Sequence, residues 1–228
     1  MKYKKIVSGT FIKRRNRFIA EVMINGELEI VHVKNTGRCE EILKEGAKIF
    51  LEKSDNPNRK TGYSLISAIK NENLINVDSQ APNKVVYESL KKEEVEPFND
   101  LKIIKKEKTF QKSRFDIYYE RKNGKKGFIE IKGVTLENEG LTKFPDAPTE
   151  RGKKHVLEMV EAVEKGYEGN ILFLIQMDNF LEFSPNREMD RKFSEALEYA
   201  KNKGVNIFIY NSIVREDEII LKERGILI

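Results

Sequence analysis

Hydrophobic and polar residues alternate in short runs through the first 80 positions, a pattern typical of β-strands. We predict strands over residues 17–24, 28–33, 47–53, 63–70 and 73–77. Asn25-Gly26 indicates a tight hairpin turn, and further turn signals lie at residues 35–37, 45–46 and 56–58. Residues 39–44 are predicted to form a short helix. Five or so short strands in this length favour a small OB-like β-barrel.

After residue 80 the pattern changes to alternating helices and strands. We predict helices over 83–94, 148–165 and 187–203, and strands over 101–105, 114–120, 127–134, 170–176 and 205–210. Thr149 is the expected N-cap of the second helix. This alternation indicates an α/β layer structure with a mixed sheet. The chain is therefore expected to have two domains, residues 1–80 and 81–228, and an α/β (α+β two-domain) fold.

Composition narrows the class of protein. The chain has 228 residues, of which 35% are charged and 39% hydrophobic, and no apolar run approaches the ~18 residues of a membrane span. The basic N-terminus has no apolar core behind it, so we expect no secretory signal. A single cysteine excludes an internal disulfide and a cysteine-rich zinc site. We expect a cytoplasmic protein without a membrane partner.

Basic charge is concentrated in the first domain. Residues 1–80 carry 15 basic and 10 acidic side chains, whereas the remaining 27 basic and 27 acidic side chains balance. This distribution favours a polyanionic partner, most simply nucleic acid. The alternative is that lysine clusters lie on solvated faces by chance. The basic residues that we expect to contact nucleic acid are Lys13, Arg14, Arg15, Arg17, Arg38, Arg59, Lys60, Arg151, Lys153 and Lys154.

Aromatic side chains accompany the first of these basic clusters. Phe11 and Phe18 flank it in the sequence, and an exposed aromatic on an OB surface can stack on a base. The alternative is that both rings belong to the barrel core. His32 and Cys39 are interpreted as structural, and His155 as a partly buried helix residue.

Three residues of the second domain can form a site for phosphate chemistry. Glu130 and Lys132 share one face of a strand because they are two positions apart. A two-residue loop at Asn123-Gly124 would place Asp116 on the opposite face. A three-residue loop over 122–124, with Gly124 in the left-handed region, pairs Asp116 with Glu130, and we predict that loop or an equivalent bulge.

Two carboxylates on adjacent strands can hold Mg²⁺, with Mn²⁺ as a substitute, and Lys132 can orient the attacking hydroxide beside them. This is the arrangement of the PD-(D/E)xK nuclease core, in which the first helix often adds an acidic residue; Glu88 is the candidate. The alternative is an ion pair on a solvated strand face. The apolar neighbours of Glu130 and Lys132 favour a buried site, where unpaired charges are costly.

Several longer motifs carry a family resemblance. They are GTFIKRRNRF (9–18), HVKNTGRCEE (32–41), NPNRKTGYSL (56–65), NVDSQAPN (76–83), SRFD (113–116), EIKGVTL (130–136) and FPDAPTERGKKHVLEM (144–159). In these motifs the chain resembles the sugar fermentation stimulation protein A (SfsA) family over about residues 3–210.

The resemblance implies a DNA-binding protein with a regulatory role in sugar (maltose) metabolism. It also implies an N-terminal OB-like domain followed by a PD-(D/E)xK nuclease-like domain, and Asp116, Glu130 and Lys132 are retained. Two alternatives stay open: a catalytically inactive DNA-binding regulator, and a protein that binds or processes RNA. The sequence gives no target site and no oligomeric state.

Overall fold

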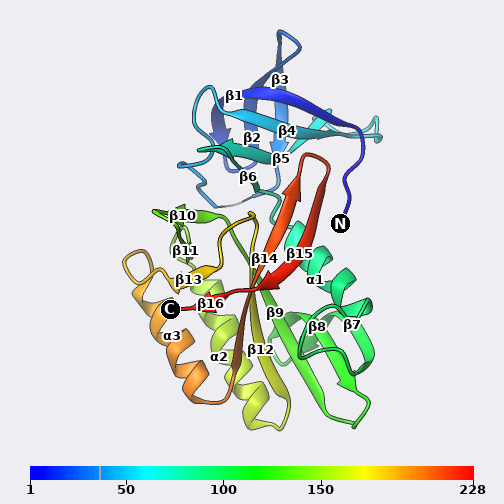
Figure 1. Cartoon of the computed structure of the whole chain (residues 1–228), viewed down its shortest axis with the longest axis vertical. Coiled ribbons are helices and arrows are strands. Elements are labelled where there is room, and N and C mark those ends of the chain that lie inside the picture. The colour runs from blue at the N-terminus through cyan, green and yellow to red at the C-terminus, as the bar shows by residue number, and fades with distance from the viewer. Residues whose placement is uncertain (36) are drawn as a thin grey trace.

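The computed structural model describes residues 1–35 and 37–228. The predicted turn residue Thr36 lies outside the described part. Across the described residues, no helix has both the length and the apolar composition needed to cross a membrane. Two domains lie one above the other in Figure 1, a barrel at the top and a layered α/β domain below it.

The N-terminal domain is a closed barrel. Its strands are β1 (Ile6–Asn16), β2 (Ile19–Ile24), β3 (Glu27–Val33), β4 (Lys48–Lys53), β5 (Tyr63–Lys70) and β6 (Asn73–Asn76). β1 pairs with β2 on one side and β4 on the other, and a parallel pairing of β3 with β5 closes the barrel. Alternate side chains such as Ala20, Val22 and Ile24 fill the interior. The predicted OB-like barrel is confirmed.

Three details of the barrel differ from the sequence prediction. Residues 39–44 form turns instead of a helix, because Cys39 has φ 50° and only one turn follows, closed by the Leu43 N–H donating to the Cys39 carbonyl. β1 was not predicted, because irregularities in its pairing with β2 interrupt the alternation of its side chains. Arg17 and Phe18 begin no strand; they form the turn between β1 and β2.

The second domain is built on a six-stranded mixed sheet in the order β15-β14-β12-β9-β8-β7. Its strands are β7 (Leu101–Phe110), β8 (Ser113–Arg121), β9 (Lys126–Val134), β12 (Glu168–Ile175), β14 (Asn206–Arg215) and β15 (Glu218–Arg224). The helices are α1 (Ala81–Lys91), α2 (Glu150–Glu164) and α3 (Arg191–Asn202). α1 covers one face of the sheet, and α2 and α3 cover the other (Figure 1).

The element order α1, β7, β8, β9, α2, β12 is that of the predicted nuclease-like core. A small second sheet was not predicted; it contains β10 (Leu136–Asn138), β11 (Leu141–Phe144), β13 (Glu182–Pro185) and β16 (Ile226–Leu227). α3 begins at Arg191 and not at 187, because the Asp190 side chain accepts from the Phe193 N–H and caps the helix there.

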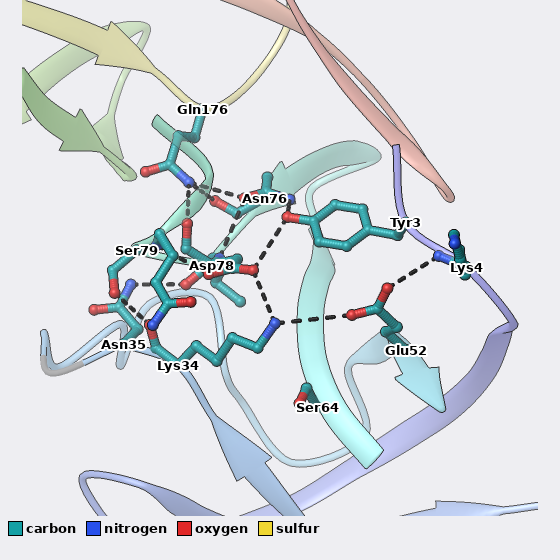
Figure 2. A network of polar contacts seen from close by, with 12 residues as sticks. Tyr3, Lys4, Lys34, Asn35, Glu52, Ser64, Asn76, Asp78, Ser79 and Gln176 are labelled. Carbon is teal, nitrogen blue, oxygen red and sulfur yellow. Dashed lines mark hydrogen bonds and ion pairs between the residues drawn. The ribbon is translucent and has the colours of Figure 1, made fainter. Parts of the chain in front are cut away.

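A buried polar network joins the two domains (Figure 2), and we call it the Asp78 network. Its members are Tyr3, Lys34, Asn76, Asp78 and Gln176. Asp78 is 1% exposed, and its Oδ2 lies 3.3 Å from Lys34 Nζ and 3.4 Å from the Tyr3 hydroxyl. Gln176, which follows β12, donates from Nε2 to Asn76 Oδ1 and to the carbonyls of Asn76 and Asp78. The linker between the domains is thereby fixed to the central sheet.

Candidate active site

The β8–β9 hairpin brings the predicted carboxylates together. Ile117 pairs with Ile129 in this hairpin, so the same register sets Asp116 opposite Glu130. The three-residue loop 122–124 produces this register, with Gly124 at φ +86°. The Ile131 N–H donates to Asp116 Oδ2 at 2.8 Å, which draws the Asp116 side chain toward β9.

Glu130 is almost fully enclosed, with 3% of its surface exposed. Its Oε1 lies 2.5 Å from Lys132 Nζ and 2.5 Å from His155 Nδ1. Burial favours the neutral acid, but the Lys132 ammonium and the His155 ring outweigh it and lower the pKa of Glu130. Glu130 Oε2 is buried and has no hydrogen-bond partner among the described residues. A buried carboxylate oxygen without a protein partner can bind a cation or a water molecule.

Asp116 has the opposite titration behaviour. Burial, followed by repulsion from Glu130, raises the pKa of Asp116 to about 6. Its Oδ1 accepts from Asn83 Nδ2 at 2.7 Å, and Asn83 belongs to the first turn of α1. Helix α1 therefore contributes an amide to the site, which sequence reasoning did not identify.

His155 reaches the site from helix α2. The Thr149 side chain accepts from the Gly152 N–H, so the predicted N-cap sets the start of this helix. Gly152, His155, Val156 and Met159 are buried at helical spacing, which places the imidazole on the side that faces the sheet. The sequence signal was available, because a histidine on an apolar helix face needs a polar partner.

These side chains line a cavity of about 480 Å³ at the domain boundary. The second domain contributes Asp116, Glu130, Lys132, Arg151, His155 and Gln176, together with the loop 144–149. The barrel contributes Arg17, Asn35 and Gly37, and Ser79 of the linker also lies in the wall. The cavity thus belongs to both domains, although sequence reasoning assigned the chemistry to the second domain alone.

Glu88 does not reach this cavity, and the prediction that it approaches the carboxylates is wrong. Its carboxylate lies 3.1 Å from the Met1 amino group. The reason is helical geometry: at 100° per residue, the five positions from Asn83 to Glu88 turn the side chain about 140° away. Asn83 occupies the place that was predicted for an acidic residue.

The donor set fits a divalent cation with few protein ligands. Asp116 and Glu130 provide oxygens, which Mg²⁺ and Ca²⁺ prefer, and Mg²⁺ usually keeps several waters. The unpaired Glu130 Oε2 and the raised pKa of Asp116 are the features that a cation would relieve. Within residues 1–35 and 37–228, no group of three or more His, Cys, Asp and Glu side chains is arranged to hold a metal. The fit rests on the two carboxylates.

One predicted nucleic-acid contact is wrong. The four terminal N–H groups of Arg14 donate to the carbonyls of Arg17, Asn35, Gly37 and Arg38, and its Nε is buried. None of the terminal N–H groups is left for a phosphate, and the remaining donor, Nε–H, is buried without a partner among the described residues. Arg14 instead fastens the β1–β2 turn to the loop that follows β3.

The other basic candidates divide into paired and open side chains. Arg15 Nε lies 2.5 Å from Glu21 Oε1, and Lys13 lies 3.7 Å from the same oxygen. Arg59 donates to Ser64 Oγ at 3.0 Å, and Lys154 lies 3.7 Å from Glu158. Arg17 and Arg151 are exposed and line the cavity, Arg38 and Lys60 are exposed, and Lys153 is half-buried.

The structure also places the two phenylalanines and the cysteine that were considered in the sequence analysis. Phe11 belongs to the barrel core, with 3% of its surface exposed, whereas 51% of Phe18 is exposed. Cys39 is buried, and burial raises its thiol pKa to about 12, as expected for a structural residue.

Comparison with protein families agrees with this two-part architecture. A model described as "Sugar fermentation stimulation protein RE domain" matches residues 80–218. A second, described as "SfsA N-terminal OB domain", matches residues 12–77. Together these two models cover most of the barrel and the six-stranded sheet through β14.

Individual proteins match along nearly the whole chain. A sugar fermentation stimulation protein homolog of Alkaliphilus oremlandii is 58% identical over 98% of this chain and 97% of its own length. A Clostridium botulinum homolog is 53% identical over 96% and 95%. The structure of Pyrococcus furiosus SfsA in complex with Ca²⁺ matches with a TM-score of 0.92 and 26% identity, over 100% of this chain and 98% of that one.

Proposed function

Because the chain belongs to the sugar fermentation stimulation protein (SfsA) family, we propose that it binds DNA and hydrolyses phosphodiester bonds in the cavity between its domains. The observation that carries the proposal is the pair Asp116 and Glu130, set opposite each other on β8 and β9 beside Lys132. The unpaired Glu130 Oε2 supports a bound cation at this pair. Mg²⁺ is the proposed ion, with Mn²⁺ as a substitute, and the Ca²⁺ complex of the Pyrococcus furiosus relative supports a divalent cation.

The side chains of the cavity have separate roles in this proposal. Asp116 and Glu130 would hold the cation, which lowers the pKa of water and offsets negative charge on the phosphate. Lys132 Nζ, fixed against Glu130 Oε1, places a positive charge where the attacked phosphate must lie. His155 holds the same oxygen from the other side and orients the carboxylate. Arg17 and Arg151 line the walls and would bind flanking phosphates.

A plasmid-nicking assay tests the hydrolysis. Wild-type protein should convert supercoiled DNA to open circles in Mg²⁺ or Mn²⁺, and a chelator should stop the reaction. Glu130→Gln should reduce the rate at least 100-fold, because it removes a charge that the cation and Lys132 require. Glu161→Gln, an identical change on the exposed face of α2, is the matched control and should retain full activity. Equal rates for Glu130→Gln and wild type would refute the site.

The same variant separates hydrolysis from regulation. The relatives' name supports a role in sugar metabolism. We propose that this role is regulatory and is exerted through DNA binding in the cytoplasm. A strain without the protein should then show altered growth on maltose. If Glu130→Gln restores wild-type growth as well as the intact gene does, regulation does not need cleavage, and the catalytically inactive alternative is correct.

RNA binding is the remaining alternative, since OB barrels bind both nucleic acids. Retention of RNA and of DNA with matched sequence, at one salt concentration, decides between them. Tighter retention of DNA is expected, and a preference for RNA would replace DNA as the substrate.

A further inference from the structure

An exposed aromatic side chain directly follows a residue of the cavity wall in the chain. Arg17 and Phe18 are the two residues of the turn that joins β1 to β2, since Asn16 pairs directly with Ile19. Arg17 lines the cavity, and Phe18 beside it is 51% exposed. Consecutive Cα atoms are about 3.8 Å apart, so the Phe18 backbone lies directly beside a residue of the cavity wall. An exposed phenylalanine leaves apolar surface in contact with water, and a ligand that packs on the ring would bury that surface.

The turn that carries Phe18 is held by hydrogen bonds on both sides. The Arg17 carbonyl accepts from Arg14 at 2.6 Å, and the Phe18 carbonyl accepts from the Val33 N–H at 2.8 Å. The Phe18 N–H donates to Asn16 Oδ1 at 2.9 Å. Little backbone entropy would be lost when a ligand packs against a turn whose backbone is already held in this way.

Arg14 also fixes a second segment of the cavity wall. It holds the loop after β3 through the carbonyls of Asn35, Gly37 and Arg38. That loop meets the second domain, where the Arg38 N–H donates to Asp146 Oδ2 at 3.0 Å. A Cβ on Gly37 would lie 2.3 Å from the same oxygen, so only glycine permits this approach. The barrel is thereby joined to the loop before α2, and the cavity is bounded by both domains.

From this arrangement we propose that the substrate is single-stranded DNA, with an unpaired base stacked on Phe18 and the adjoining phosphate bound by Arg17. The inference rests on the proposed function, because it specifies the substrate of the same cavity. A base offers its face to a side chain only when it is unstacked, whereas duplex bases are covered by their neighbours. A cavity of about 480 Å³ has the size that takes one small ligand or nucleotide.

Binding is measured by fluorescence anisotropy with a labelled 20-nucleotide strand and with the same strand in a blunt duplex, in Ca²⁺. Wild-type protein should bind the single strand more tightly than the duplex. Phe18→Ala should weaken single-strand binding about 5- to 100-fold, which corresponds to the loss of one base stack. Phe18→Tyr should restore binding. Leu28→Ala removes another exposed apolar side chain, at 57% exposure on β3, and should bind like wild type.

Equal or tighter binding of the duplex overturns the inference, as does a Phe18→Ala protein that binds the single strand as well as Leu28→Ala does. Cleavage is scored separately in Mg²⁺ on a duplex with a single-stranded tail. Cuts confined to the tail support the inference, and cuts confined to the duplex overturn it. If the wild type cuts nothing, the proposed hydrolysis fails, while Phe18-dependent single-strand binding still stands as evidence for the inferred substrate.

Discussion

Two groups of buried polar side chains lie at the boundary between the domains, and they differ in how completely they are paired. In the Asp78 network, the buried carboxylate has Lys34 and Tyr3 as partners, and Gln176 Nε2 donates to three acceptors. In the cavity, Glu130 Oε2 has no partner among the described residues, and the pKa of Asp116 is raised. The same fold therefore satisfies Asp78, but leaves Glu130 incompletely paired and Asp116 with a raised pKa.

The difference separates a structural role from a ligand-binding one. A buried polar group with all its partners adds to the definition of one native arrangement, whereas a buried group without them costs free energy until a ligand arrives. Gln176 belongs to both groups, because its side chain also lines the cavity. A Cβ on Gly133 would lie 2.2 Å from Gln176 Oε1, so β9 approaches the network closely. The Asp78 network thus supports one wall of the cavity.

The largest expected effect is a loss of stability when the Asp78 network is disrupted. Asp78→Ala removes the acceptor of the buried Tyr3 hydroxyl and leaves the partly buried Lys34 ammonium with only Glu52, at 3.8 Å. Removal of one partner from a buried ion pair typically costs about 3–5 kcal/mol of unfolding free energy. Urea denaturation measures the loss. Glu52→Ala is the control, because Glu52 lies farther from Lys34, at 3.8 Å, and is 28% exposed. A loss below about 1 kcal/mol for Asp78→Ala would show that the network does not hold the domains together.

The next effect is a pH dependence that comes from the cavity. The pKa of Asp116 is about 6 in the folded protein, above its ordinary value of 3.8. The folded state therefore binds this proton more tightly, so the associated stability is complete below about pH 4 and is lost as pH rises through 6. The loss amounts to roughly 3 kcal/mol. Urea unfolding between pH 4 and 7 in chelator measures it. Asp116→Asn should lose this part of the pH dependence. If its unfolding free energy varies with pH as that of the wild type does, the raised pKa does not belong to Asp116.

A divalent cation should remove the same penalty. At 100 times its dissociation constant, a ligand that binds only the folded state adds about 2.7 kcal/mol. Thermal unfolding with and without millimolar Mg²⁺ or Mn²⁺ should show a higher midpoint for wild type, and smaller shifts for Asp116→Asn and Glu130→Gln. Asp78→Asn, in the Asp78 network, is the control and should show the same metal-induced rise in unfolding midpoint as the wild type. Identical shifts in all four proteins would eliminate the two carboxylates as the metal site.

Sequence reasoning located the carboxylates because the relevant information is local. The register of β8 and β9 depends on the loop 122–124. Gly124 is compatible with a two-residue or a three-residue loop, and the three-residue form is the one that pairs Asp116 with Glu130. Strand alternation then places Glu130 and Lys132 on one face. The barrel was predictable for the same reason, since Asn25-Gly26 and the alternating runs define neighbouring strands.

The wall of the cavity that comes from the barrel could not be predicted from local pattern. Arg14 and Arg17 look equivalent in a basic run, yet Arg14 is used by four backbone carbonyls and Arg17 faces the cavity. Phe18 was placed in a strand because the two-residue turn contains no glycine. These assignments depend on which loops meet across the domain boundary, and that contact is non-local in sequence.

The smallest expected effect concerns Glu88, which belongs to neither group. Its contact with the Met1 amino group, at 3.1 Å, is partly solvated, and such pairs contribute about 0.2–1 kcal/mol. Glu88→Gln should therefore lower the unfolding free energy by less than about 1 kcal/mol. Because α1 directs Asn83 and not Glu88 to Asp116, the Mg²⁺-induced midpoint shift should equal that of wild type. Asn83→Ala, which removes the amide that donates to Asp116 Oδ1, should alter the metal shift. A reduced metal response in Glu88→Gln, with a normal one in Asn83→Ala, would mean that helix α1 presents its acidic residue to the cavity after all.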